Sequence, residues 1–171
     1  MINKNQLTER SFTPSQLSGF DGAHSIQLPV DFIHDLSKAD SLQAVLDTIA
    51  YWISHVFDAD RASITLQDTE EYLKLYSISG NHAIPMDFKI PIGQTFVGRV
   101  FACAKLIICD DLAQSDELDC KMLSEHGMGT CMDAPMVHNG VCIGTLNVAD
   151  INVNITTPYN KRFFYRVSPL G

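Results

Sequence analysis

The stretch EHGMGTCMDAPMVHNGVCIGTLNVAD, residues 125–150, decides the fold. Within it, Asn139-Gly140 lies between two apolar runs of similar length, TCMDAPMVH and VCIGTLNVA. Asn-Gly is the strongest two-residue signal for a β-hairpin, because both central residues of that turn need positive φ. Both arms are apolar on both faces, so we expect them to lie in the centre of a sheet that is covered on each side.

The chain before this hairpin alternates between helical and strand patterns. Apolar residues of 42–56 recur at helical spacing, and Asp40 with Gln43 predicts a capping box. RASITLQ (61–67) and YLKLYSIS (72–79) alternate with a period of two, typical of half-buried strands joined in a hairpin. A short strand around 88–90, a helix over 94–105, a strand over 106–111 and a helix over 115–127 follow. The order predicts an α+β fold with a central antiparallel sheet of five to six strands and helices on both faces.

Composition and charge fit one soluble domain. The net charge of −8 argues against a nucleic-acid surface, and no apolar run approaches the ~20 residues of a membrane helix. Without a signal-peptide core, we expect a cytoplasmic protein whose five cysteines are free thiols. All 20 acidic residues lie at or before Asp150. We therefore expect a polar leader or short helix at 1–29, the domain at 30–150, and a shortened C-terminal helix or tail at 151–171.

Two segments carry a family resemblance. PIGQTFVGRVFACAKLIICDD (91–111) is similar to a Gly-x-x-x-x-Gly-x-Val helix start followed by a strand that ends in Asp. MDAPMVHNGVCIGTLNVAD (132–150) is similar to a Pro-Leu hairpin with a turn glycine and a Gly-x-Leu strand. In this order they resemble a GAF domain, the small-molecule-sensing fold of cyclic-nucleotide phosphodiesterases, phytochromes and many bacterial regulators. The resemblance covers Val30 to Asp150.

Asp133 is the residue of the hairpin that stands out, because a carboxylate in an apolar strand is costly unless it is paired or solvated. One interpretation is an ion pair with Arg99 or Lys121, or a bulge at Pro135 that turns Asp133 to water. The other is a pocket wall, since the resemblance implies a ligand between the sheet and the loops before the hairpin. The candidate ligand-binding residues are Phe88, Phe96, Arg99, Asp116, Cys120, Asp133 and Asn147.

Catalytic and metal patterns are weak. The sequence has no Cys-x-x-Cys pair, and we expect Cys131 and Cys142 to be neighbouring core thiols on one face of the hairpin. One branch of the GAF family reduces free methionine-(R)-sulfoxide, and Cys120 lies near its catalytic cysteine. Val97 stands where that branch has a second cysteine, and Asn147 and Ala149 stand where it has acidic residues. Lys121 stands where bilin-binding relatives commonly have a histidine after the cysteine.

These observations favour a non-catalytic, cytosolic sensory domain that binds an unidentified small molecule, for which a nucleotide-type ligand is one option. The resemblance implies signalling through the terminal helices, a homodimer, and a cyclase or diguanylate-cyclase-type effector. No cofactor can be named from the sequence. Two alternatives stay open: a methionine-sulfoxide reductase that uses Cys120, and a ligand-free dimerisation module.

Overall fold

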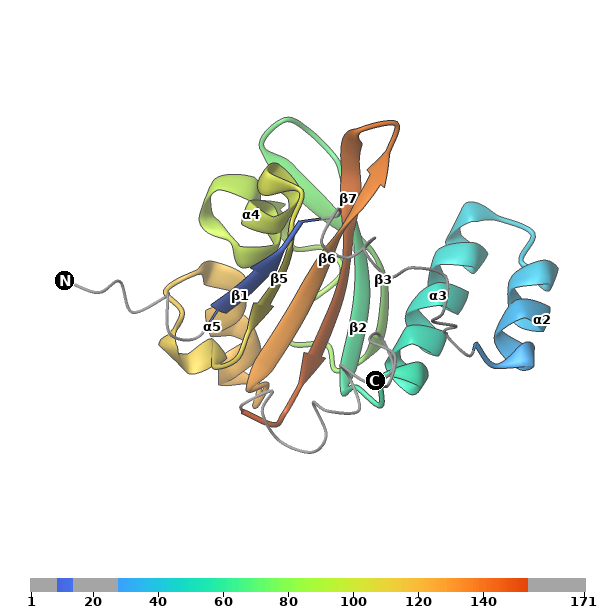
Figure 1. Cartoon of the computed structure of the whole chain (residues 1–171), viewed down its shortest axis with the longest axis horizontal. Helices are drawn as coiled ribbons and strands as arrows, with labels where there is room; N and C mark the ends of the chain where they lie inside the picture. Colours follow the sequence, from blue (N-terminus) through green and yellow to red (C-terminus); the bar gives the residue numbers. More distant parts are fainter. Residues whose placement is uncertain (1–8, 14–27, 154–171) are drawn as a thin grey trace.

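The computed structural model describes residues 9–13 and 28–153 (Figure 1). The expected C-terminal helix or tail therefore lies outside the described residues, apart from 151–153. In chain order the elements are β1 (Glu9–Phe12), α2 (Val30–Lys38), α3 (Leu42–Val56), β2 (Arg61–Gln67), β3 (Tyr72–Gly80), β4 (Lys89–Pro91), η2 (Ile92–Gln94), α4 (Phe96–Cys103), β5 (Leu106–Cys109), η3 (Leu112–Gln114), α5 (Leu118–Glu125), β6 (Thr130–His138) and β7 (Val141–Asp150).

The strands of the described part form one antiparallel sheet in the order β1-β5-β6-β7-β2-β3-β4. The sheet has seven strands where the sequence predicted five to six. The added strand is β1, which lies in the segment expected to be a leader and pairs with β5 from Glu9–Cys109 to Phe12–Leu106. By pairing with β5, it covers backbone groups that would otherwise form an open sheet edge.

Helices lie on both faces of the sheet, as predicted. Figure 1 shows α4 and α5 on one side and α2 and α3 on the other, with α2 outside α3. Strand alternation explains the two layers. Ile64 packs with Leu46 and Ala50 of α3, whereas Ser63 and Thr65 belong to the opposite face. A larger core cluster fills the space beneath α4 and α5.

The predicted β6–β7 hairpin is confirmed. Asn139 and Gly140 have φ of 50° and 79°, as the Asn-Gly turn requires. The two arms pair from Thr130–Asp150 to His138–Val141, with a register shift between Met136 and Val137. Both strands lie in the middle of the sheet.

The expectation for the hairpin thiols was wrong. Cys131 pairs with Ala149 near the base of the hairpin, whereas Cys142 pairs with Val137 near its turn. The two thiols are thus at opposite ends of the paired strands and are not neighbours.

The start of α3 also differs from the prediction. Ser41, not Asp40, is the N-cap, and its side chain accepts a hydrogen bond from the Ala44 amide at 3.2 Å. Gln43 does not close a capping box. Its side-chain nitrogen donates instead to the backbone oxygen of Tyr76 at 2.6 Å, which ties α3 to β3.

The N-terminus of α4 packs closely against η2. A Cβ atom at Gly98 would lie 2.2 Å from the backbone oxygen of Ile92, so this position requires glycine. The close approach fixes where α4 covers the sheet. Within residues 9–13 and 28–153, no helix is long and apolar enough to cross a membrane.

Candidate functional site

A cavity lies between the centre of the sheet and the layer formed by α4, α5 and the segment before β4. Its volume is about 30 Å³, which is room for about two water molecules. Polar and apolar side chains line it together: Arg61, Ser63, Thr65, Leu75, Ile84, Ile90, Val97, Asp119, Leu123, Cys131, Asp133, Asn147, Val148 and Ala149.

A polar row crosses the sheet beneath this cavity. Asp133 on β6 pairs with Asn147 on β7, and Asn147 pairs with Ser63 on β2. The Asn147 side-chain nitrogen donates to the Ser63 hydroxyl at 3.4 Å. The Asn147 Oδ1 atom is buried and has no hydrogen-bond partner among the described residues.

Asp133 is 5% exposed and makes no hydrogen bond to any described residue. Neither ion pair suggested by the sequence forms. Arg99 binds two other carboxylates, and Lys121 lies 3.8 Å from Asp116. Burial raises the pKa of Asp133 well above its ordinary value, Asp119 adds to the increase, and Arg61 opposes it. A neutral carboxyl group in this position can both donate and accept a hydrogen bond.

Arg61 is the cation of the cavity, and it was not among the residues singled out in the sequence. It is 3% exposed and donates to the backbone oxygens of Asn81 and Ile84, the latter at 3.5 Å. Burial lowers the pKa of its guanidinium to about 10, although the nearby Asp133 carboxyl opposes this. Arg61 lines the cavity together with Ser63 and Thr65, the polar residues of the RASITLQ alternation, and α4 and α5 cover this face of β2.

Asp119 was also missed, and it caps α4 from α5. Its carboxylate accepts hydrogen bonds from the backbone amides of Phe96 and Val97 at 2.8 and 2.9 Å, and from that of Cys120 at 3.0 Å. The Thr95 hydroxyl accepts a further amide bond at this helix start. A carboxylate there satisfies amides that have no partner within the helix and complements the helix dipole. The sequence carries no local signal for this cap, because the two helices are separated by β5.

Three thiols meet beside the cavity. Cys120 of α5 belongs to the same core cluster as Cys109 and Cys131, which pair across β5 and β6. The Cys109 thiol lowers the pKa of Cys120, but the Cys131 thiol and burial outweigh this effect and raise the pKa. The pKa of Cys131 is raised to about 12: the Cys120 thiol lowers it, while burial and the neighbouring Asp133 outweigh that effect. Of the three, Cys131 lines the cavity.

Arg99 joins three elements outside the cavity. It binds Glu117 at 2.8 and 3.0 Å and Glu9 at 2.8 and 3.1 Å, so it links α4 to the start of α5 and to β1. The two carboxylates raise the pKa of its guanidinium. The Arg99 guanidinium also lies 5.1 Å from the centre of the Phe96 ring.

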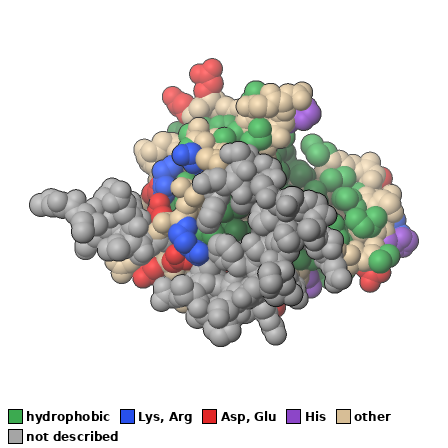
Figure 2. Space-filling view, viewed as in Figure 1, with side chains coloured by type: hydrophobic (Ala, Val, Ile, Leu, Met, Phe, Trp, Pro, Cys, Tyr) green, Lys and Arg blue, Asp and Glu red, His purple; other side chains and the backbone are tan. Residues whose placement is uncertain are grey.

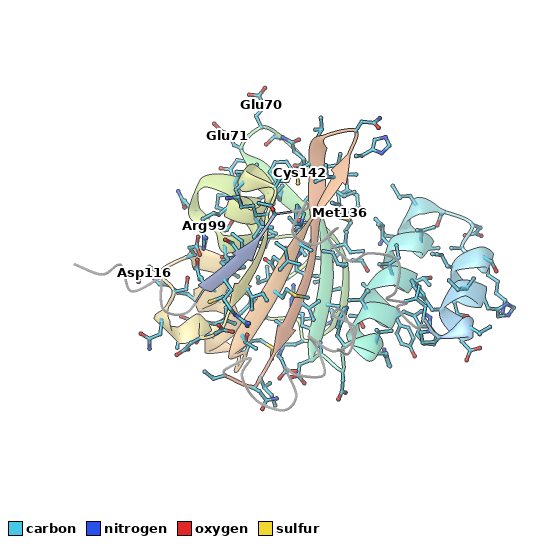
Figure 3. The ribbon with its side chains drawn as sticks, viewed as in Figure 1. Glu70, Glu71, Arg99, Asp116, Met136 and Cys142 are labelled. Atoms are coloured by element: carbon cyan, nitrogen blue, oxygen red, sulfur yellow. The ribbon has the colours of Figure 1, made fainter. Side chains whose placement is uncertain are left out.

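The candidate residues from the sequence thus occupy different places. Asp133 and Asn147 line the cavity. Phe96 and Cys120 are buried in the adjoining core, and Phe88 packs against it. Arg99 lies at the outer side of α4, and Asp116 is fully exposed (Figure 3). No group of three or more metal-binding side chains occurs among the described residues.

Several solved structures share this fold. Similar structures include the GAF domain of a phosphoenolpyruvate-protein phosphotransferase from Coxiella burnetii (15% identity, TM-score 0.64, 81% of this chain and 84% of that one). The GAF domain of A. aeolicus nlh2 is 12% identical (TM-score 0.64, coverage 80% and 83%). The free methionine-R-sulfoxide reductase of Neisseria meningitidis, solved with its substrate, is 18% identical (TM-score 0.62, coverage 80% and 79%).

At these identities the likeness concerns the fold alone. No curated protein is similar enough in sequence to count as a relative. Residues 41–167, however, match the sequence pattern of the GAF domain as a family. The match extends from α3 through β7 and includes the helices and strands that surround the cavity. This chain therefore belongs to the GAF domain family.

Proposed function

We propose that the chain is a non-catalytic sensory domain that binds a small molecule in the cavity beneath α4 and α5. The observation that carries the proposal is a pair of buried polar groups with no hydrogen bond to a described residue, the Asp133 carboxyl and the Asn147 side-chain oxygen. Buried polar groups in native proteins are nearly always hydrogen-bonded, and exceptions call for a ligand, a water molecule or a functional reason. Two such groups side by side in one cavity favour a binding site.

The size of the cavity bears on the ligand. A volume of about 30 Å³ holds about two water molecules. A nucleotide-type ligand would require α4 and α5 to move away from the sheet. The structure as it stands therefore favours a ligand much smaller than a nucleotide.

Strand β2 supports a route for the signal. Its residues Ser63 and Thr65 line the cavity, whereas Ile64 between them packs against Leu46 and Ala50 of α3 on the opposite face. A ligand that shifts β2 therefore acts on α3 through direct packing, because closely packed interiors transmit displacement. The α3 helix is the output element in this proposal.

The α2–α3 layer offers a surface for a partner. Val30 and Ile33 of α2 and Leu42 and Tyr51 of α3 are exposed, and Figure 2 shows hydrophobic side chains on this part of the surface. Exposed apolar residues on neighbouring helices support a second copy of the chain as partner. A cyclase or diguanylate-cyclase-type effector stays a prediction from the family resemblance.

The geometry around Cys120 favours binding over thiol catalysis. A reactive cysteine needs access and a thiolate that forms near neutral pH. Cys120 has no exposed surface, its pKa is raised, and it does not line the cavity. These three facts support a structural role for Cys120 in this proposal.

A thermal-shift screen tests the proposed function. Amino acids, amines, nucleotides and small anions are added to the wild-type chain and to Asn147→Leu, which replaces the unpaired amide by an apolar side chain. A ligand of the cavity raises the wild-type Tm as ln(1 + [L]/Kd) and has a much smaller effect on the variant. Asp116→Asn, an exposed position, serves as a control that keeps the response.

Two results contradict the proposal. The first is a screen in which no compound raises the wild-type Tm. The second is a compound that stabilises Asn147→Leu as strongly as the wild type, because such a compound binds elsewhere.

A further inference from the structure

Two acceptor groups of the cavity have no hydrogen bond from a described residue. The Asn147 Oδ1 atom is buried without a donor, and the neighbouring Asp133 carboxyl, 5% exposed, has no hydrogen bond within the described residues. The two residues are directly opposite on β6 and β7. A single ligand group with two or more N–H bonds that lies in the cavity, over this pair of residues, can therefore donate to both.

Two donor groups that line the cavity are engaged with other partners. Arg61 donates to the backbone oxygens of Asn81 and Ile84. The Asn147 side-chain nitrogen donates to Ser63. Among the described residues, no hydrogen bond reaches the Asn147 Oδ1 atom or the Asp133 carboxyl, so a donor group of a ligand can bind both.

The balance of charge points the same way. Two carboxyl groups, Asp119 and Asp133, line the cavity together with one guanidinium, Arg61. The Asp119 carboxylate accepts hydrogen bonds from three backbone amides, so it already has partners within the fold. Asp133 has no hydrogen-bonding partner among the described residues, and a positive charge beside it would favour its ionised form.

We infer that the ligand of this cavity is a small organic cation with N–H donors, a primary ammonium or an amidinium with a short apolar part. This inference rests on the proposed binding function and names the ligand class for it. The cationic group donates to Asp133 and to the Asn147 oxygen. The apolar part contacts Ile90 of β4 and Leu123 of α5, and these side chains must move apart to admit a group larger than two water molecules.

Other ligand classes fit less well. A carboxylate or phosphate would place further negative charge beside Asp133 and Asn147 Oδ1. A neutral alcohol offers one donor for two acceptors. Water molecules are the main competitor, since the cavity has a volume of about 30 Å³, room for about two of them.

Binding of a cation should depend on pH through Asp133. The carboxyl is largely protonated in the free protein when the pH is below its raised pKa, and a cation favours its ionised form. Affinity therefore rises with pH, and binding releases a proton. The charged groups that act on Asp133 are Arg61 from β2, Asp119 and Glu117 from α5, and Arg99 from α4.

The test uses three probes of similar shape: n-propylammonium, 1-propanol and propanoate. Each is titrated at millimolar concentration into the full chain, and the side-chain amide signal of Asn147 is followed by NMR. Propylammonium is expected to shift this signal with saturation, more strongly at pH 8 than at pH 6. Asp133→Asn should weaken its binding by about tenfold or more, because a charge-assisted hydrogen bond is lost. Asp116→Asn removes an exposed carboxylate and should leave binding unchanged.

The outcomes separate the ligand class from the binding function. If propanol or propanoate binds at least as tightly as propylammonium, as judged from the Asn147 signal, the inferred ligand class is wrong. The cavity would still be a binding site. The inference of a cationic ligand is also wrong if propylammonium binds the wild type and Asp133→Asn with equal affinity. It is equally wrong if the affinity of the wild type does not rise with pH. If no probe or compound reaches Asn147 and only water exchanges there, both the inference and the proposed function fail.

Discussion

Asp133 on β6 lies directly opposite Asn147 on β7, and the two line one cavity in the middle of the sheet. Asn147 donates to Ser63, but neither its oxygen nor the Asp133 carboxyl has a hydrogen bond from a described residue. A fold keeps such groups at a cost, because a buried polar group without a partner loses its hydration and gains nothing in return. That cost gives the site measurable consequences even without its ligand.

Replacing Asp133 by Asn should change how stability depends on pH. Burial raises the pKa of Asp133 in the folded state. The contribution of Asp133 to the free energy of unfolding is therefore fully present below its unfolded pKa of about 4. It is lost as the pH rises towards the folded pKa, at about 1.4 kcal/mol per pH unit. In urea unfolding from pH 4 to 8, the free energy of unfolding of Asp133→Asn should increase relative to that of the wild type as the pH increases. A constant difference between the two proteins would contradict the assignment.

Asp119→Asn should destabilise the fold, although Asp119 lines the same cavity as Asp133. Its carboxylate accepts three backbone hydrogen bonds and caps α4. Asp119→Asn keeps the shape but turns an N–H₂ group towards amide donors, so we expect a loss of about 1–3 kcal/mol in the free energy of unfolding. Asp116→Asn, at a fully exposed position of the same segment, is the matched control and should change little. Similar losses for both variants would argue against the cap.

Much of the fold follows from local sequence signals. The Asn139-Gly140 turn requires residues that tolerate positive φ, and its flanking runs alone predict the central hairpin. Strand β1 gives no such signal, because four residues form it and its stability comes from pairing with β5 and from the ion pairs of its side chains. An edge strand of this kind depends on tertiary partners that a local pattern does not contain.

The candidate site was only partly predictable for the same reason. Asp133 and Asn147 stand out as polar residues in apolar strands. Arg61 and Asp119 do not, since a polar residue at a strand end or in the first turn of a helix is ordinarily solvated. What buries them is the placement of α4 and α5 over β2, which depends on contacts between distant segments.

Gly98 should tolerate no side chain. A Cβ atom there would lie 2.2 Å from the Ile92 backbone oxygen, whereas one at Gly93 would meet nothing within 4 Å. Gly98→Ala is expected to lower the free energy of unfolding by about 1–3 kcal/mol, because α4 must move away from η2. Gly93→Ala should be close to neutral in the same chemical denaturation experiment. Equal effects of the two substitutions would show that α4 does not depend on this close contact.

Arg99 should hold β1 on the sheet. Its guanidinium binds Glu9 of β1 and Glu117 at the start of α5, with 38% of its side chain exposed. Arg99→Gln removes both pairs, and we expect a loss of about 1 kcal/mol, since partly exposed pairs contribute little individually. Hydrogen exchange of residues 9–12 should accelerate more than exchange in β6. Lys121→Gln, which breaks only the 3.8 Å pair with Asp116, should leave both unchanged.

The thiols provide the most direct test between sensing and catalysis. Cys103 is exposed, whereas Cys109, Cys120 and Cys131 are buried and have raised pKa values. With a thiol-specific alkylating reagent at neutral pH, Cys103 should react quickly in the folded protein. The three buried thiols should react at the rate of global unfolding, because the thiolate is the reactive form and burial disfavours it. Mass spectrometry after proteolysis assigns each modified cysteine, and urea-unfolded protein gives the unprotected rates. Alkylation of Cys120 or Cys131 as fast as Cys103 in the folded state would favour the reductase alternative over a purely sensory domain.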